Sequence, residues 1–252
     1  MPHTTLTVFT LKPGNQRWGL AQMGTSPPPL QRVPGLSFFK LLGSGARNGF
    51  GLWPNLRRYA LLGVWADEDA AAHFFAHHPL WSVYQERSAE MWSLVMEPLK
   101  AQGLWDGKTP FDYAPAPRPA DHAPMAVLTR ASIRWRKTPR FWQFVEPTSA
   151  TLAGAAGVLA AIGLGELPVV RQATFSVWES AQAMKEFAYH DARHREVMVL
   201  TRREQWYAEE MFARFRVLSS AGTLDGRDPL AEWFGGSIPQ VVAREPTKTI
   251  GR

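Results

Sequence analysis

The sequence contains no cysteine, no apolar run of membrane-spanning length and no N-terminal signal-peptide pattern. Without cysteine, disulfides, iron–sulfur clusters, thiolate-ligated haem and cysteine nucleophiles are all excluded. The longest apolar run, residues 151–165, is shorter than the roughly 20 residues that a spanning helix needs, and it is rich in glycine. We expect it to be a buried helix end followed by a strand. The N-terminus lacks the basic segment and apolar run of a signal peptide, which predicts a cytoplasmic protein.

What the chain does have is apolar content and positive charge. It has 252 residues, 45% of them hydrophobic, which is enough for a sizeable core. The net charge of +6 favours acidic partners: nucleic acid, anionic lipid or a cofactor that carries carboxylates. In the most basic stretch, residues 134–142, arginines and a lysine alternate with aromatic residues. No other segment resembles a nucleic-acid module, so the stretch is either a solvated turn leading into a helix or a contact with an anionic membrane surface.

The chain also repeats itself. Residues 58–78 match residues 171–191 without a gap, so that Trp65 falls on Trp178 and His77 falls on His190. Shorter matches follow the same order along the chain: 6–13 with 125–132, 41–45 with 161–165, and 87–92 with 202–206. Such self-similarity at a nearly constant offset predicts a tandem duplication.

Hydrophobic periodicity gives the same plan for each copy. Strands are expected at 5–11, 37–43, 58–65 and 91–97 in the first copy and at 125–133, 158–163, 171–178 and 207–217 in the second. Helices are expected at 67–77, 80–89, 180–190 and 193–204, and a short one in the segment PRFWQFVEP. The order β-α-β-β-α-β is typical of a ferredoxin-like unit. We therefore predict an α+β fold in which two tandem ferredoxin-like units form a pseudo-symmetric α/β barrel. Its parts are a first half at 1–113, a linker at 114–124, a second half at 125–219 and a tail at 220–252.

Two histidines in the second copy raise the question of a cofactor. His190 and His194 are four residues apart, so both imidazoles project from one face if this segment is helical. The first copy has His77 in the place of His190 but Trp81 in the place of His194. A residue present in only one copy is the better candidate for a single site, which favours His194. Two ordinary boundary histidines are the alternative, and a zinc pair would need a third ligand, whereas haem needs only one axial histidine.

Long motifs add a resemblance to a known family. The chain is similar to the spheroidene monooxygenase family of carotenoid-modifying enzymes over roughly residues 8–218, through the segments QRWGLAQMG, PGLSFFKLLGSGARNGFGLWPNLRRYALLGVWAD, VLTRASIR, GLGELPVVRQATFSVWES and HREVMVLTRREQWYAEEMFARF. The resemblance implies an enzyme with haem b and its iron that uses O2 in successive hydroxylations to place a keto group at C-2 of acyclic carotenoids. The predicted barrel also resembles that of the chlorite dismutases and dye-decolorising peroxidases. Those enzymes carry the axial histidine on a helix of the second half, which is where His194 lies.

A haem site also needs polar groups and counter-charges. Gln172, Thr174 and Ser176 share one face of the strand at 171–178, where buried polar groups need polar partners; neighbouring backbone is the ordinary alternative to a ligand. Two arginines, Arg130 and Arg171, are candidates for the distal group or for binding the haem propionates. The segment LLGSG follows Lys40 and contains two glycines that allow close approach of a ligand, unless it is only a strand end; the residues concerned are Lys40, Gly43 and Gly45.

The expected partners follow from the same interpretation. The chain has no flavin or nicotinamide fingerprint, so we expect a ferredoxin-type electron donor, together with O2 and a hydrophobic carotenoid-like substrate. We also expect peripheral contact with the inner membrane and no nucleic acid. The competing interpretations are a haem peroxidase or dismutase-like enzyme acting on another apolar substrate, and a non-catalytic barrel that binds haem or a hydrophobic ligand.

Overall fold

In the computed structural model the described residues are 3–46, 49, 51, 53–113, 123–167, 169–190 and 192–235; the side chains of 145–150, 190 and 192–194 are not described. The first half contains β1 (His3–Leu11), α1 (Gln16–Thr25), α2 (Pro27–Leu30), β2 (Leu36–Gly45), β3 (Pro54–Trp65), α3 (Glu68–His77), α4 (Pro79–Arg87) and β4 (Ser88–Gly103). The second half contains β5 (Met125–Ile133), the 3-10 turn η1 (Trp135–Lys137), α5 (Thr138–Ala153), β6 (Val158–Leu167), β7 (Arg171–Trp178), α6 (Ala181–His190), α7 (Ala192–Glu204), β8 (Tyr207–Gly222) and α8 (Ala231–Phe234).

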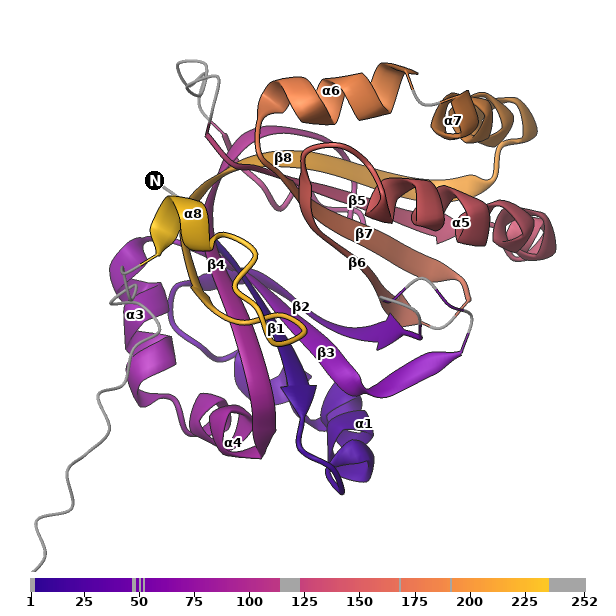
Figure 1. Cartoon of the computed structure of the whole chain (residues 1–252). Coiled ribbons are helices and arrows are strands. Elements are labelled where there is room, and N and C mark those ends of the chain that lie inside the picture. The colour runs from indigo at the N-terminus through magenta and orange to yellow at the C-terminus, as the bar shows by residue number, and fades with distance from the viewer. Residues whose placement is uncertain are drawn as a thin grey trace, which may run out of the picture.

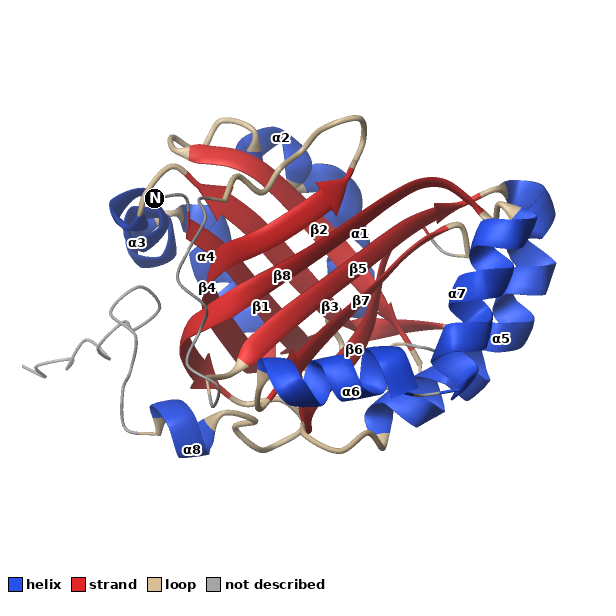
Figure 2. Cartoon of the chain, turned by 90° about the horizontal axis from the view of Figure 1, so that it is seen from above, coloured by secondary structure: helices blue, strands red, loops and turns tan. Residues whose placement is uncertain are grey.

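The strands form a closed antiparallel barrel in the order β1-β3-β2-β6-β7-β5-β8-β4. Each half contributes the strand order of a ferredoxin-like unit, and the halves join where β2 pairs with β6 and where β4 pairs with β8. Helices α3 and α4 cover the outside of one half of the barrel, and α5, α6 and α7 lie outside the other (Figure 1; Figure 2). The predicted α+β fold of two tandem ferredoxin-like units is therefore confirmed.

Strand register supports the internal duplication. Trp65, the last residue of β3, pairs with His3 at the start of β1, and Trp178, the last residue of β7, pairs with Met125 at the start of β5. The structure aligns the closing strands β4 and β8 differently from the sequence match of 87–92 with 202–206. In their mutual pairing, Trp92 meets Gly222 and Gly103 meets Met211, so Trp92 corresponds to Met211 rather than to Trp206.

Alternating side chains divide the strands between two environments. The barrel interior is filled by residues such as Leu6, Leu62, Leu94, Leu128 and Phe215, all about 1% exposed or less. The opposite face of each sheet packs against helices. Alternation along a strand thus assigns every residue either to the interior or to the helix-covered side, and this assignment sorts the candidate site residues.

Several elements differ from expectation. Helices α1 and α2 were not predicted, since α1 buries only Gly19 and has little apolar periodicity. The closing strands continue beyond 97 and 217, to Gly103 and Gly222, because each runs on into a tight Asp-Gly hairpin. Helix α5 is longer than the short helix expected, ending at Ala153. In the described part of the chain, no helix combines the length and hydropathy needed to cross a bilayer.

Candidate functional site on the second half

The predicted site residues separate into two groups on opposite faces of the barrel wall. Lys40, Arg130 and Arg171 belong to the set that faces the interior, because they alternate with the outer-face residues of β2, β5 and β7. Gln172, Thr174 and Ser176 belong to the outer face. His194 lies in α7, on the outer side, and the side chains of His190 and His194 are outside the described residues.

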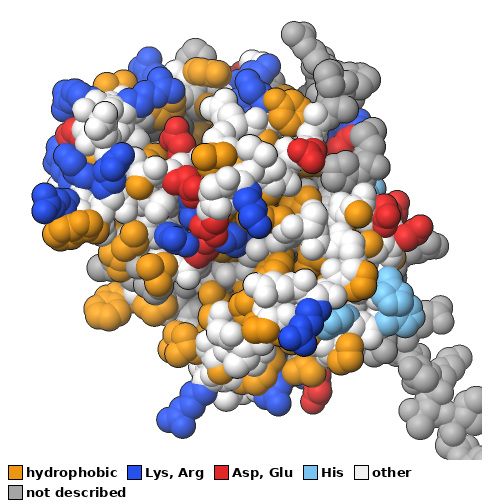
Figure 3. Space-filling model, turned by 180° about the vertical axis from the view of Figure 1, so that it is seen from behind, with side chains coloured by type: hydrophobic (Ala, Val, Ile, Leu, Met, Phe, Trp, Pro, Cys, Tyr) orange, Lys and Arg blue, Asp and Glu red, His pale blue; other side chains and the backbone are white. Residues whose placement is uncertain are grey.

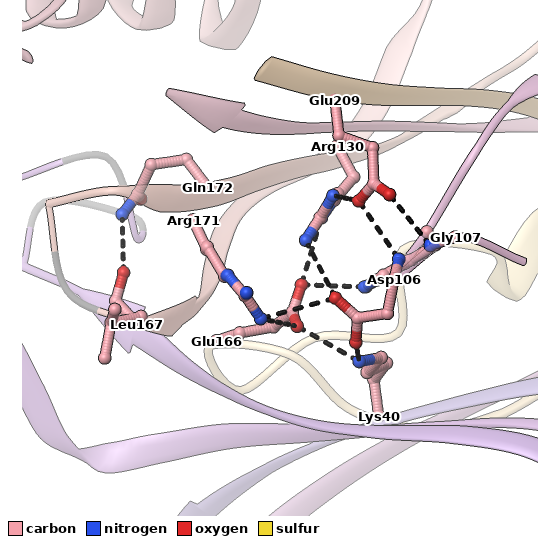
Figure 4. Close-up of polar contacts among 10 residues, drawn as sticks. Lys40, Asp106, Gly107, Arg130, Glu166, Leu167, Arg171, Gln172 and Glu209 are labelled. Atoms are coloured by element: carbon pink, nitrogen blue, oxygen red, sulfur yellow. Dashed lines mark hydrogen bonds and ion pairs between the residues drawn. The ribbon is translucent and has the colours of Figure 1, made fainter. Parts of the chain in front are cut away.

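The interior group forms an ion-pair cluster at one end of the barrel (Figure 4). Arg130, only 1% exposed, donates from Nε to Glu166 Oε1 at 3.0 Å and from Nη1 to Glu209. Lys40 binds Glu166 Oε2 at 3.1 Å and also Asp106, which Arg171 approaches at 3.3 Å. All three cations therefore have carboxylate partners within the protein. The roles of Arg130 and Arg171 as distal or propionate-binding groups, and of Lys40 in binding the cofactor, stay predictions.

Trp105 closes this end of the barrel. Its side chain is fully buried, its Nε1 donates to Glu166 Oε1 at 2.7 Å, and the Lys40 ammonium and Arg130 guanidinium lie 5.7 and 5.5 Å from its ring centre. Trp105 enters a hairpin whose central residues, Asp106 and Gly107, both have positive φ angles, as a type I′ turn requires. Glu209 accepts hydrogen bonds from the backbone N–H groups of both residues, at 3.0 and 2.8 Å, and so fixes the turn in the cluster.

A second Asp-Gly hairpin with the same kinds of partners lies at the other end of the barrel. Asp225 and Gly226 also have positive φ angles, Gly226 donates its backbone N–H to Glu90, and Asp225 pairs with Arg58. The sequence contains the signal for both hairpins, WDGK at 105–108 and LDGR at 224–227. The Asp-Gly dipeptide is a strong hairpin signal, so this repeat could have identified the turn at Asp106. Sequence reasoning missed Asp106, Glu166 and Glu209 as site residues, and no sequence signal brings the two glutamates to this turn.

We expect Arg130→Met to destabilise the protein strongly. It would leave the carboxylates of Glu166 and Glu209 without their buried guanidinium partner, a change that costs roughly 3–5 kcal/mol in comparable buried pairs. For a protein of this size, thermal denaturation should show a fall in Tm of roughly 10 °C. Arg203→Met is the matched control, because Arg203 is 69% exposed and its pair with Glu204 is at the surface. Equal stability of the two variants would contradict a structural role for the cluster.

The same cluster makes stability depend on pH. Burial raises the pKa of Asp106, but the hydrogen bond and charge of Lys40, with the charges of Arg171 and Arg130, outweigh it and lower this pKa below its usual value. The pKa of Glu209 is also lowered: burial opposes the shift, and the backbone N–H groups of Gly107 and Asp106 with Arg130 produce it. Both carboxylates therefore stabilise the fold above their unfolded pKa of about 4, and this contribution is lost as pH falls through the lower folded values.

Glu209→Gln should accordingly lower Tm at pH 7 by several degrees, since hydrogen bonds to charged groups contribute about 1.5–3 kcal/mol. The gap between the wild-type and variant melting temperatures should narrow as pH falls below about 4, because the Glu209 carboxylate becomes protonated there in the unfolded chain and only at lower pH in the folded protein. Thermal melts between pH 7 and pH 3 measure this. A gap that stays constant over that range would show that the Glu209 charge does not contribute.

The outer-face group has a different environment. Ser176 is buried and accepts a hydrogen bond from Trp178 Nε1 at 2.9 Å, so its partner is a neighbouring side chain rather than the backbone. Gln172 and Thr174 are half-buried, and Gln172 Nε2 makes a long 3.5 Å contact with the Leu167 carbonyl. Thr129, paired directly with Thr174, is exposed although β5 has a paired strand on each side.

The same face of the first half is closed by large side chains. Phe9 pairs with Tyr59, and Leu61 pairs with both Thr7 and Leu41; all five are buried under α1, α3 and α4. The corresponding pairs in the second half are Ala131 with Gln172, and Thr174 with both Thr129 and Gly163. Small or polar residues therefore replace Phe9, Tyr59, Leu61 and Leu41, and the centre of the second half's outer face is less filled.

Gly43 and Gly45 lie where the two halves join. Gly43 pairs with Gly165 across the junction of β2 and β6. A Cβ on Gly45 would come within 2.3 Å of the Gly51 carbonyl oxygen and 2.6 Å of that of Gly49. The close approach at Gly45 is between backbone segments, whereas a Cβ on Gly43 would make only an ordinary contact of 3.8 Å with the Gly165 carbonyl oxygen. Contact of either glycine with a ligand stays a prediction.

Comparison with known proteins gives the chain its family. Residues 141–218 match a domain of unknown function, DUF3291. The chain is 36% identical to the spheroidene monooxygenase of Rhodobacter capsulatus over 92% of this chain and 96% of that protein. It is 38% identical to that of Rubrivivax gelatinosus over 88% and 84%, and 36% identical to that of Cereibacter sphaeroides over 92% and 72%.

Solved structures agree on the fold alone. A crystal structure of aldoxime dehydratase aligns with a TM-score of 0.54 at 10% identity, covering 86% of this chain and 81% of that one. An identity this low carries no information on the reaction. The three sequence relatives are 36–38% identical to this chain and match it over most of their own length. The chain therefore belongs to the spheroidene monooxygenase family.

Proposed function

We propose that the protein is a haem-dependent monooxygenase that places a keto group at C-2 of acyclic carotenoids. The carotenoid substrate is supported by the names of the three relatives. The observation that carries the cofactor part of the proposal is the difference between the two halves on their outer faces. Residues that fill this face in the first half are exchanged for small or polar ones in the second, at the sheet face beside α5, α6 and α7.

The residues of the second half fit a flat, largely apolar cofactor between sheet and helices. Gly163 and Ala131 leave room where Leu41 and Phe9 stand in the first half. Thr129, Thr174 and Gln172 present hydroxyl and amide groups to the same side. A bound haem would supply the activation of O2 that hydroxylation of an unactivated C–H bond requires.

His194 is the proposed axial ligand. It is the third residue of α7, and Trp81 is the third residue of α4. Trp81 is 1% exposed and packs against Phe75 and Phe74, at ring-centre distances of 4.7 and 5.9 Å, so this helix position faces inward in the first half. The proposal uses the same position in the second half for the ligand.

The polar residues of β7 have a steering role in this proposal. Gln172 and Thr174 are hydrogen-bond donors on the outer face, where they can orient O2 and the oxidised carbon without carrying charge into an apolar site. Each hydroxylation consumes one O2, two electrons and two protons and releases one water. A second hydroxylation at the same carbon gives a geminal diol, which loses water to form the ketone. The electrons come from a ferredoxin-type donor.

Spectroscopy and turnover of the purified protein test this function. The expected results are a Soret absorption band and conversion of an acyclic carotenoid that requires O2 and a reduced ferredoxin. Turnover with NAD(P)H alone would refute the ferredoxin-type donor. Oxidation driven by hydrogen peroxide but not by O2 and reductant would favour a peroxidase. Turnover by protein freed of haem would refute the haem assignment while leaving the carotenoid substrate in place.

A further inference from the structure

The strongest unexplained feature outside the proposed site is a basic surface at one end of the second half. It comprises side chains of η1 and the residue before it, the start of α5 and the last turns of α7, all exposed except the half-buried Lys137: Arg134, Trp135, Arg136, Lys137, Arg140, Val199, Arg202 and Arg203. Figure 3 shows Lys and Arg side chains gathered beside exposed hydrophobic ones at the end where α5 and α7 lie. We call these eight residues the basic–aromatic surface.

Main-chain and side-chain contacts hold its parts together. The backbone N–H of Arg134 donates to the Trp206 carbonyl at 2.8 Å, which ties η1 to the segment after α7. Arg140 and Arg203 both approach the carboxylate of Glu204, at 4.0 and 3.7 Å. Segments that are far apart in the sequence thus form one continuous surface.

The charge of this surface is unusual. In the part of the chain that the structure describes, the ion pairs made by its basic side chains go to one carboxylate, that of Glu204, which also accepts a hydrogen bond from Trp206 Nε1 at 2.9 Å. The net charge of the whole chain is only +6. Most of the excess positive charge is therefore on this one surface, which favours an anionic partner.

Exposed apolar side chains lie among the cations. Trp135 is 72% exposed and Val199 is 62% exposed, and the Arg136 guanidinium lies 5.1 Å from the Trp135 ring centre. Val199 shares a helix face with Arg202 and Arg203. Tryptophan beside arginine and lysine is the residue combination typical of membrane interfaces, where the indole lies at headgroup level and the cations bind anionic lipid.

We propose that the basic–aromatic surface docks the protein on the surface of an anionic phospholipid membrane. The purpose of such docking rests on the proposed function, because a carotenoid substrate is dissolved in lipid. Helices α5 and α7, which carry this surface, also lie over the outer face of the second half, where the proposed site is. The surface itself rests on charge and exposure alone. An acidic electron-donor protein fits the charge equally well, but it gives no reason for an isolated, exposed tryptophan among the cations.

Vesicle binding tests the proposal without haem or substrate. The wild-type protein should co-sediment with phosphatidylcholine vesicles that contain phosphatidylglycerol, and much less with pure phosphatidylcholine. Each cation near an anionic surface contributes about fivefold to binding, so Arg134→Gln/Arg136→Gln/Lys137→Gln should weaken it about 100-fold. Trp135→Ala should weaken binding to both kinds of vesicle. Added salt should weaken the wild type more than the triple variant.

The matched control is Arg17→Gln/Arg32→Gln/Lys108→Gln, which removes the same charge from exposed positions elsewhere. It should bind vesicles like the wild type. Unchanged binding by the first triple variant, or equal loss in both triple variants, would overturn the proposal. Retained vesicle binding with loss of ferredoxin-supported turnover would assign the surface to the electron donor instead.

Enzyme assays separate this inference from the function itself. If both are correct, the triple variant of the basic–aromatic surface turns over a detergent-dispersed carotenoid normally and a vesicle-embedded one slowly. If the wild type binds vesicles but oxidises no carotenoid in either form, the proposed function fails and the docking surface stands.

Discussion

Replacing His194 with alanine is expected to abolish haem uptake and with it all carotenoid oxidation. The chain has no cysteine, so histidine is the first choice for the axial ligand and tyrosine the second. His194 is the histidine of α6 and α7 that has no counterpart in the first half, where Trp81 takes its place. Haem titration followed at the Soret band measures uptake directly, and far-UV circular dichroism checks that the variant is folded.

His190→Ala is the control for this variant. His77 occupies the equivalent last position of α3, where its Nδ1 contacts the His73 carbonyl at 3.2 Å and its ring stacks on His73. A histidine repeated at a helix end in both halves serves the helix, so the His190 variant should keep its Soret band. Haem lost from the His190 variant but retained by the His194 variant would reverse the assignment, and unchanged spectra in both would place the ligand elsewhere.

Much of the fold could be predicted because it depends on local patterns. Strands such as β5 and β7 show alternation and clear boundaries, and the match of Trp65 with Trp178 is enough to indicate the duplication from the sequence alone. Helix α1 could not be predicted in this way. It packs through Trp18, Met23 and the close approach of Gly19 to Leu11 and Tyr59, and no periodic apolar stripe marks it.

The candidate site could be predicted only in part, because the face to which a strand residue points depends on the barrel as a whole. Alternation in the sequence already places Arg171 and Gln172 on opposite faces of one strand, but only the closed barrel shows that Arg171 is on the interior side and Gln172 on the outer side. Arg130 was expected to bind a ligand. Its partners Glu166 and Glu209 come from two other strands, and their convergence follows from the barrel register, which the sequence does not state.

Replacing two residues of β7 with their first-half equivalents is expected to fill the proposed cofactor site. In Gln172→Tyr/Thr174→Leu, two residues of β7 become the residues that stand at the equivalent positions of β3, Tyr59 and Leu61. Both substituted residues are half-buried on the outer face, so the larger side chains would enter the less-filled space rather than the packed barrel interior. Haem affinity should fall by at least tenfold while the protein stays folded.

The reverse exchange in the first half is the matched control. Tyr59→Gln/Leu61→Thr removes buried side chains that are 4% and 5% exposed, which should destabilise the protein by roughly 2–5 kcal/mol through lost packing. Because the second half is unchanged, haem affinity should stay at the wild-type value at temperatures where this variant is folded. Opposite effects of the two exchanges on haem binding and on stability would establish that one half is built for packing and the other for a ligand. If Gln172→Tyr/Thr174→Leu binds haem as tightly as the wild type, the cofactor does not occupy the outer face of the second half.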